Sequence, residues 1–415
     1  MLTSGINFKN FKLKSNNSKI KKELFSILNN KNEVLLSLGE NYKTNFNLNK
    51  YKNFKNIRII GMGGSTLGTQ TIYDFLKHKI KKKLFFIDNL QAYKKKESKQ
   101  KKFLNLIVSK SGNTVETIVN SNILIRKQDK NLFITENKKN YLHDLAKKLK
   151  AEIIHHNNYI GGRYSVLSEV GMIPSELMGL NSKKFKQFNY LIKNKKFINS
   201  LVANVNASLS LIKKKKFNSI IINYDEKSEN LFKWYQQLIA ESLGKKKNNS
   251  IILNYDENSD DLFKWYQQLV GESLGKKQKG IFPFISTMPK DNHSLMQLYL
   301  DGPQKNFFTF FGVSEKKSNK IINSTILETF NFIKNKKFSQ ILDSQRIATQ
   351  KVFNNMNIPF RSFEIKRRNE ETLGELFTFF ILETILLGKC LKINPYDQPA
   401  VELIKKSTKK TLINF

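Results

Sequence analysis

The feature that most constrains the fold is an alternation of short apolar runs with helical patterns between residues 57 and 154. The apolar runs lie at 57–60, 84–87, 103–108, 132–134 and 153–154. Short strands that are apolar throughout and alternate with helices predict a parallel sheet covered by helices on both faces. Ligands bind beyond the carboxyl ends of such strands. The turns that follow the first and third runs are therefore candidate binding segments.

The turn after the third run, Ser109 to Thr117, is rich in hydroxyl and amide side chains and contains one glycine, Gly112. It leads into a helical pattern that begins at Val115. The N–H groups of a helix's first turn have no partner within the helix, so an anion such as phosphate can bind there. The same residues could equally form an ordinary helix cap and a polar turn.

Two other turns contain paired glycines. The first, Gly61-Met62-Gly63-Gly64-Ser65, has the wrong glycine spacing for a dinucleotide fingerprint and lacks the lysine of a P-loop. Its glycines would let a ligand approach the main chain, with Ser65 as a hydrogen-bond partner. The second, Gly161-Gly162-Arg163, places an arginine at the start of a helical pattern. Arg163 could cap a surface loop or, near a bound phosphate, stabilise developing negative charge.

The second half of the chain contains an internal repeat. Residues 218–247 reappear at 249–278, with Leu-Phe-Lys-Trp-Tyr-Gln-Gln-Leu and Glu-Ser-Leu-Gly-Lys-Lys in both copies. Each copy predicts a strand followed by an amphipathic helix. A solenoid needs at least three units, so this is a local tandem duplication. Strands expected at 307–311 and 360–365, with helices between and after them, complete a second β/α unit.

Composition excludes several classes of protein. The formal net charge of +38 comes almost entirely from lysines spread along the chain, whereas specific nucleic-acid readers use arginines in local patches. The single cysteine, Cys390, excludes an intrachain disulfide and is compatible with a reducing compartment. No secretory signal is evident. The most apolar stretch, 376–387, is too short to span a membrane and contains Glu383, so it predicts a buried helix.

Six motifs in order together resemble the glucose-6-phosphate isomerase family. They are Gly61 to Ser65, Ser109 to Thr117, Gly161 to Ser165, Gln-Leu-x-x-Glu-Ser-Leu-Gly-Lys, Asp-Asn-His-Ser and Asn-Pro-Tyr-Asp-Gln-Pro. The resemblance covers nearly everything after residue 55. It implies two sugar-isomerase (SIS-type) domains, each a parallel sheet flanked by helices. We expect a helical arm at 1–50, a first domain at 51–180, a second at 181–375 that includes the duplication, and a C-terminal helical segment at 376–415 that completes the active site.

The resemblance also implies interconversion of glucose 6-phosphate and fructose 6-phosphate through a cis-enediol. The phosphate would be held by Ser109, Lys110, Ser111 and Thr114. The base would be Glu272 or Glu241, the enediolate would be stabilised by Arg163, and His293 and Lys405 would act near ring opening. Gly64, Ser65 and Gln398 would complete the sugar pocket. Family members are typically cytoplasmic dimers that need no cofactor or metal, and the histidine segment reaches the neighbouring subunit's site.

The duplication leaves two candidate bases. Only one short segment joins Glu272 to His293, whereas Glu241 is followed by a whole extra strand and helix. Long surface insertions cost little closure entropy, so either copy could be the inserted one. The arrangement with Glu272 as the base disturbs the site less. Three other residues depart from the family pattern: Ser111 replaces a usual Thr, and Ala400 and Ile404 replace common glycines near Lys405. Two alternatives remain, an isomerase that also accepts mannose 6-phosphate and a noncatalytic sugar-phosphate-binding protein.

Overall fold

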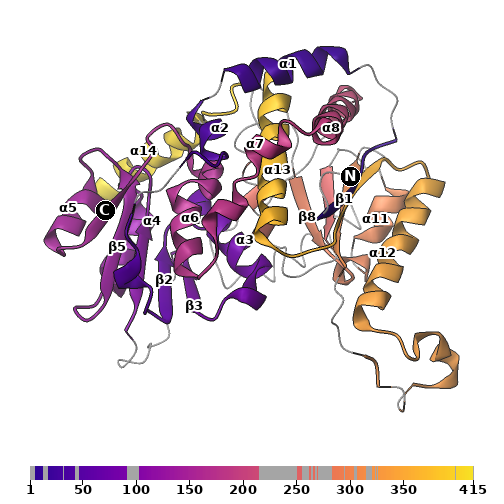
Figure 1. Cartoon of the computed structure of the whole chain (residues 1–415), viewed down its shortest axis with the longest axis horizontal. Helices are drawn as coiled ribbons and strands as arrows, with labels where there is room; N and C mark the ends of the chain where they lie inside the picture. The colour runs from indigo at the N-terminus through magenta and orange to yellow at the C-terminus, as the bar shows by residue number, and fades with distance from the viewer. Residues whose placement is uncertain are drawn as a thin grey trace.

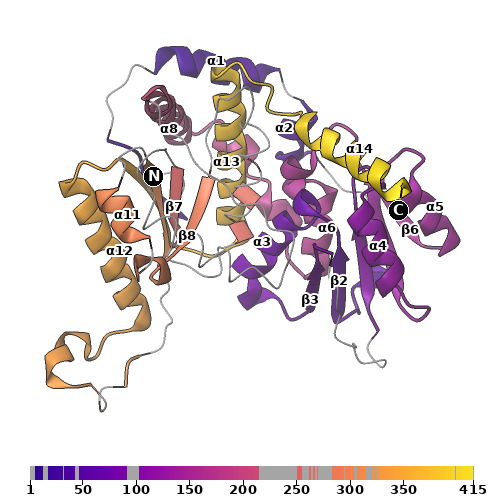
Figure 2. The same cartoon turned by 180° about the vertical axis from the view of Figure 1, so that it is seen from behind.

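The computed structural model describes residues 5–12, 17–30, 32–42, 46–90, 102–214, 250–254, 261–262, 265–266, 269, 283–293, 295–302, 306–314, 320–322, 324, 326–397 and 399–414. Within these ranges the chain forms two five-stranded sheets, one in each of two lobes (Figure 1). Both sheets are flanked by helices (Figures 1 and 2), so the expected α/β class with two helix-flanked sheets is confirmed.

The first lobe alternates strands and helices as the sequence predicts. Its elements are β2 (Asn56–Ile60), η2 (Gly63–Ser65), α3 (Leu67–Phe75), η3 (Lys77–Lys79), β3 (Lys83–Ile87), β4 (Leu104–Val108), α4 (Val115–Leu124), β5 (Lys130–Glu136), α5 (Tyr141–Lys148), β6 (Glu152–His156), η4 (Gly162–Leu167) and α6 (Glu169–Leu177). The strand order is β3-β2-β4-β5-β6, and all neighbours are parallel.

Two of the predicted turns meet at the point where this strand order reverses. The chain passes from β2 outward to β3 and then returns to β4 on the other side of β2. The connections after β2 and β4 therefore leave the sheet in opposite directions, which is where open α/β sheets bind ligands. The turns lie close together, because a Cβ atom on Gly61 would be 2.8 Å from the carbonyl oxygen of Val108.

The second lobe repeats this arrangement. Its elements are β7 (Ser250–Asn254), β8 (Pro283–Thr287), η8 (Lys290–His293), α11 (Met296–Asp301), β9 (Phe307–Val313), η10 (Glu328–Ile333), α12 (Phe338–Asn355) and β10 (Phe360–Ile365). The order is β1-β10-β9-β7-β8, in which β7 to β10 are parallel. Strands β8-β7-β9-β10 thus follow the order of β3-β2-β4-β5.

The N-terminal segment differs from the helical arm that we expected. It contains α1 (Ser18–Asn29), α2 (Glu33–Ser37) and η1 (Asn49–Tyr51), but also the strand β1 (Ile6–Lys9). Strand β1 pairs antiparallel with β10 at the edge of the second sheet. Alternation explains the strand, because Ile6 and Phe8 are buried on one face while Lys9 is exposed. The segment therefore belongs partly to the second lobe.

The predicted buried helix is α13 (Glu370–Cys390), which begins several residues before the apolar stretch. Figure 1 shows it between the lobes, near α1 and α8 (Lys195–Lys213). Its buried Glu383 accepts hydrogen bonds of 2.6 Å from both Arg361 on β10 and Asn204 on α8. This pairing offsets the cost of burying the charge. No helix within the described ranges has the length and apolar character needed to cross a membrane.

The remaining elements join the lobes and end the chain. They are η5 (Ser182–Phe185), α7 (Phe188–Leu191) and α14 (Pro399–Ile413). Figures 1 and 2 show that α14 lies on the first lobe, although it follows α13 in sequence.

The second copy of the repeat supplies an inner strand of the second sheet. Its strand, β7, lies between β8 and β9. The described residues after it are helical, and Leu262, Trp265, Tyr266 and Leu269 are buried. The Trp265 ring meets Phe377 of α13 edge-on, with 4.7 Å between the ring centroids. Copy 1, residues 218–247, lies outside the described residues.

Candidate active site

The Ser109–Thr117 turn is held by its own side chains and by a neighbouring loop. The Oγ atom of buried Ser109 lies 2.9 Å from Oγ1 of Thr114, the residue that precedes α4. Thr114 accepts no hydrogen bond from the first turn of the helix. Gly112 has a φ of +64°, and a Cβ there would lie 1.9 Å from Oδ1 of Asn140. The hydroxyls therefore bind each other rather than capping α4, which favours the anion seat over the simple cap.

Lys110 and Ser111 complete this turn. The carbonyl oxygen of Lys110 accepts hydrogen bonds from Thr135 Oγ1 and from the backbone N–H of Glu136, so its backbone is fixed. Burial lowers the pKa of the Lys110 ammonium, and the positive charge of Arg163 adds to this effect while Glu136 opposes it. Ser111 is exposed, and its Oγ accepts a 3.3 Å hydrogen bond from the N–H of Asn113. Two cations, Lys110 and Arg163, therefore act on the same region.

The glycine turn after β2 contacts the arginine turn directly. A Cβ on Gly64 would lie 2.3 Å from the carbonyl carbon of Gly162 and 2.6 Å from the backbone nitrogen of Arg163. Real Cβ atoms do not approach other atoms so closely, so only glycine fits here. Ser165 Oγ donates to the carbonyl oxygen of Gly162 at 2.7 Å and lies 3.4 Å from that of Gly64. Ser65 is half-buried in the same turn.

Arg163 connects three parts of the chain. Its buried Nη2 donates to the carbonyl oxygens of Pro395 at 2.8 Å and Asp397 at 3.1 Å, within the Asn-Pro-Tyr-Asp-Gln-Pro motif. The hydroxyl of Tyr164 also donates to Pro395 O, at 2.9 Å. Trp265 of repeat copy 2 donates from Nε1 to the carbonyl oxygen of Arg163 at 3.2 Å. The arginine turn, the C-terminal motif and copy 2 thus meet in one place.

The other predicted site residues are not brought to this point by any described contact. His293 ends η8, is exposed, and makes no described hydrogen bond or ion pair with Arg163 or with the Ser109–Thr114 turn. Lys405 is exposed on α14. Glu272, Glu241 and Gln398 lie outside the described residues.

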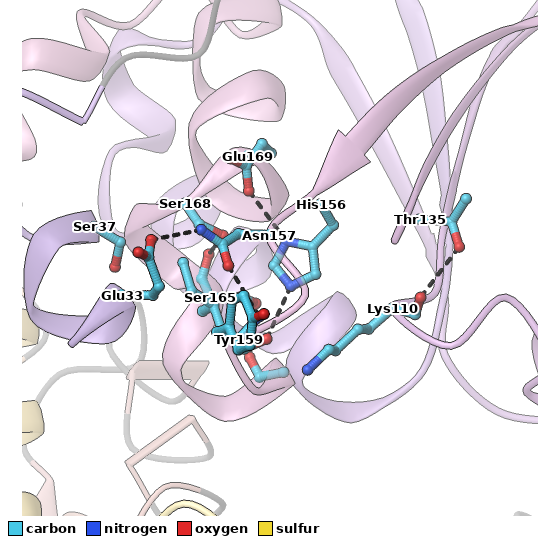
Figure 3. Close-up of polar contacts among 12 residues, drawn as sticks. Glu33, Ser37, Lys110, Thr135, His156, Asn157, Tyr159, Ser165, Ser168 and Glu169 are labelled. Atoms are coloured by element: carbon cyan, nitrogen blue, oxygen red, sulfur yellow. Dashed lines mark hydrogen bonds and ion pairs between the residues drawn. The ribbon is translucent and has the colours of Figure 1, made fainter. Parts of the chain in front are cut away.

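Sequence reasoning missed a buried polar cluster behind the arginine turn (Figure 3). His156, the last residue of β6, lies with Nδ1 3.1 Å from Glu169 Oε2 and Nε2 3.1 Å from the carbonyl oxygen of Ile160. Tyr42 donates to the other oxygen of Glu169 at 2.5 Å. The buried ammonium of Lys186 donates to the carbonyl oxygens of Ser37 and Leu167. The sequence signal for this cluster is weak: His156 ends a strand shortly before the glycine pair Gly161-Gly162.

Burial and hydrogen bonds shift three pKa values inside the cluster. Burial acts to raise the pKa of Glu169, but the hydrogen bonds from His156 and Tyr42 hold that pKa below its usual value. Burial and the contact with Glu169 raise the pKa of Tyr42, so its hydroxyl remains a donor. Burial lowers the pKa of Lys186 to about 7, although Glu169 opposes the shift. Glu169 is therefore a carboxylate with both oxygens engaged.

Solved structures share this architecture. A hypothetical protein from Thermus thermophilus is similar with a TM-score of 0.71 at 21% identity, covering 95% of this chain and 94% of that chain. A glucose-6-phosphate isomerase from Chlamydia trachomatis has a TM-score of 0.60 at 18% identity, covering 95% of this chain and 77% of that chain. The two sheets, with a hydroxyl-rich turn at the switch point of the first, define a protein of the sugar-phosphate isomerase fold.

Sequence comparison places the chain within that class. Residues 28–256 match the family model described as phosphoglucose isomerase. The glucose-6-phosphate isomerase of Methanocaldococcus jannaschii is 31% identical over 380 residues, which cover 87% of this chain and 86% of that protein. The glucose-6-phosphate isomerase of Campylobacter jejuni is 28% identical over 374 residues, covering 86% and 85%. The chain belongs to the phosphoglucose isomerase family.

Proposed function

We propose that the protein interconverts glucose 6-phosphate and fructose 6-phosphate by proton transfer through a cis-enediol. The observation that carries this proposal is the meeting of the family's motifs: the glycine turn, the arginine turn, the C-terminal motif and copy 2 contact one another beside the hydroxyl-rich turn. Relatives named glucose-6-phosphate isomerase favour this reaction over the mannose and noncatalytic alternatives.

The turn after β4 would bind the phosphate. Ser109, Ser111 and Thr114 supply hydroxyls, Lys110 supplies charge, and the first turn of α4 supplies backbone N–H groups. Binding the phosphate here would leave the rest of the sugar to extend toward Gly64, Ser65 and Gln398. Binding of the phosphate group orients the reacting carbons at the other end of the sugar. It raises the rate only if it holds those carbons in the geometry of the transition state.

The chemistry needs a base and a cation. Glu272 would take the proton from C2 of the open-chain aldose, giving a cis-enediolate with negative charge on the C1 oxygen. It would return the proton to C1 while a proton moves from the C2 hydroxyl to the C1 oxygen, which leaves the ketose. Arg163 would stabilise the enediolate, and His293 and Lys405 would assist ring opening.

The position of copy 2 supports Glu272 as the base. Its strand β7 lies inside the second sheet, and its Trp265 donates to the backbone of Arg163. A base borne by the same copy would follow Trp265 along one helix. We expect Glu272→Gln to remove activity and Glu241→Gln to leave at least half of it, measured as the rate of fructose 6-phosphate formation. The reverse result would assign the base to copy 1.

Arg163 provides the direct test of the proposed reaction. Arg163→Ala should lower kcat by about 100-fold with a smaller change in KM, because the charge is matched to an anion that exists mainly in the transition state. The exposed Arg367→Ala is the matched control and should retain full activity. A wild-type protein that fails to isomerise glucose 6-phosphate, or an Arg163→Ala protein with normal kcat, would contradict the proposal.

We further propose that the enzyme is a cytoplasmic homodimer without a cofactor. The exposure of His293, and its lack of a described contact with Arg163, support a role in the partner's site rather than in its own. Exposed apolar residues on the segment 320–338, which projects from the second lobe in Figures 1 and 2, supply a surface for association.

A further inference from the structure

We propose that His156 and Lys186 are positioning residues that fix the two ends of the arginine segment, residues 160–167, and so hold Arg163 in place for the reaction. This inference rests on the proposed function, because it assigns a role within the same site. Neither side chain belongs to the six motifs, and both are buried.

His156 fixes the start of the segment. Its Nε2 lies 3.1 Å from the carbonyl oxygen of Ile160, the residue immediately before Gly161-Gly162-Arg163. Its Nδ1 lies 3.1 Å from Oε2 of Glu169. A backbone carbonyl oxygen and a carboxylate oxygen both accept hydrogen bonds, so the ring lies between two acceptors. Figure 3 shows the contact between the His156 ring and Glu169.

Glu169 and Tyr42 fix the orientation of the imidazole. Glu169 is the first residue of α6, where a carboxylate is favoured by the helix dipole. One carboxylate oxygen faces His156 and the other accepts the Tyr42 hydroxyl at 2.5 Å. Because both oxygens are engaged, the carboxylate cannot rotate without breaking one of these contacts. The ring of His156 is therefore held in a single orientation by α6 and the N-terminal segment.

Lys186 fixes the end of the segment. Its Nζ donates to the carbonyl oxygen of Leu167, the last residue of η4, and to that of Ser37 at the end of α2. The ammonium also lies 5.1 Å from the centre of the Tyr42 ring. An amine retains N–H donors in either protonation state, so these bonds persist when the buried group loses its charge.

Between these two fixed ends the segment has little freedom. Gly162 packs against Gly64, and the Arg163 guanidinium donates to Pro395 and Asp397. Removing one end contact would let the backbone that bears Arg163 shift, while the Ser109–Thr114 turn on another loop keeps its own contacts. Misplacement of a catalytic group by about 1 Å can cost about 100-fold in rate.

The experiment compares two pairs of variants. His156→Phe keeps a ring but removes both ring nitrogens, and its control, His155→Phe, changes the exposed neighbour on the same strand. Lys186→Met keeps the chain length but removes the amine, and its control, Lys183→Met, changes an exposed lysine nearby. We expect kcat to fall by about 10-fold or more in the two buried variants, with inhibition by inorganic phosphate changed by less than about threefold. Both controls should match the wild type.

A double-mutant cycle separates positioning from general loss of structure. If His156 acts through Arg163, the His156→Phe change should cost much less kcat in an Arg163→Ala background than in the wild type. Independent, multiplicative losses would overturn the inference. Equal losses of kcat and phosphate affinity would also overturn it, because they would indicate damage to the whole site.

A second measurement does not depend on turnover. Hydrogen–deuterium exchange should accelerate by about tenfold in the peptide that contains residues 160–168 of His156→Phe or Lys186→Met, and should stay unchanged in the peptide that contains Ser109 to Thr117. If His156→Phe does not fold, His156→Gln, which keeps one amide donor, replaces it. Unchanged exchange in residues 160–168 would refute the positioning role even if the proposed reaction proved correct, and accelerated exchange would support it even if the substrate proved different.

Discussion

At the scale of single residues, Lys110 combines a fixed backbone with a partly buried ammonium. Burial lowers its pKa from 10.5, and the charge of Arg163 acts in the same direction. The folded protein therefore loses this positive charge at a lower pH than an exposed lysine would. A phosphate dianion in the turn would lose part of its electrostatic attraction as the charge is lost. Phosphate affinity should thus fall with rising pH, beginning below pH 10.5.

This prediction is tested by measuring inhibition by inorganic phosphate between about pH 7 and pH 10. Inhibition of the wild-type protein by phosphate should weaken as the pH rises toward about 10. Lys110→Arg should keep its affinity there because a guanidinium stays charged, while Lys110→Met should bind weakly with little pH dependence. A wild-type inhibition constant that stays constant across the range would show that the Lys110 charge does not contribute to the phosphate seat.

The residues that could be predicted from sequence share a local signature. Gly64 lies in an uncommon run of glycines, and Ser109 and Thr114 lie in a dense group of hydroxyls, so local chemistry marked them as candidates. Their roles in binding were implied only by the family resemblance. His156 and Lys186 have no such signature. Their roles depend on carbonyl oxygens of Ile160 and Leu167 and on the side chain of Glu169, and these contacts exist only after the strand, η4 and α6 have packed together.

At the scale of elements, hydrophobic pattern predicted the strands and helices of the first lobe because each has its own apolar period. Pattern failed where an element depends on a distant partner. Strand β1 is only four residues long and gains its stability from pairing with β10 at the far end of the chain. Of the helices expected between the strands at 307–311 and 360–365, the first is instead the 3₁₀ helix η10, which has no buried residue. A segment without a buried face has no tertiary packing to stabilise an α-helix.

The duplication raises the question of which repeat copy supplies the strand and helix of the second lobe. The two copies are almost identical in sequence, so pattern could not decide between them. The described residues include part of copy 2. Copy 2 supplies β7, packs Trp265 against Phe377, and places the Tyr266 hydroxyl 3.1 Å from Glu383 Oε2 and within 3.2 Å of Arg361. These contacts link the helix of copy 2 to β10 and α13.

Removing copy 1 tests whether copy 2 is sufficient. A chain lacking residues 218–248 should fold, unfold cooperatively and retain kcat within about twofold, because long surface insertions contribute little to stability and can be removed. Circular dichroism during heating and the isomerase assay report the two properties. Point variants in the full chain give the control: Trp265→Ala should lower the midpoint of unfolding by several degrees, and Trp234→Ala should change it less. Loss of activity on deletion would show that copy 1 is required.

At the scale of the whole molecule, the segment 320–338 extends away from the second lobe (Figures 1 and 2). Its large apolar residues are unusually exposed, including Leu327 at 76% and Phe332 at 69%. Phe330 and Phe332 lie against each other, with 5.3 Å between ring centroids. Exposed apolar residues gathered on one projecting segment favour association. The net charge of +38 opposes association between identical chains, so any dimer should be weaker at low ionic strength.

The dimer prediction concerns both assembly and activity. Replacing Phe330 and Phe332 together by Ser should shift the protein toward monomer in sedimentation velocity at physiological salt, whereas Phe25→Ser, at an exposed position of α1, should not. If His293 serves the partner's site, the monomer should also lose activity, and activity should return as protein concentration rises. A variant that is monomeric and fully active would show that each subunit contains a complete site.

Mixed dimers test the shared site most directly. Glu272→Gln and His293→Ala homodimers should each be inactive. If each site combines Glu272 of one subunit with His293 of its partner, a mixed dimer contains one site with both native residues and one with both replaced. Random exchange of equal amounts should therefore restore about a quarter of the wild-type activity, because about half of the dimers are mixed and each has one working site. In a site built from one subunit alone, every site in the mixture would lack one group, and exchange would restore no activity.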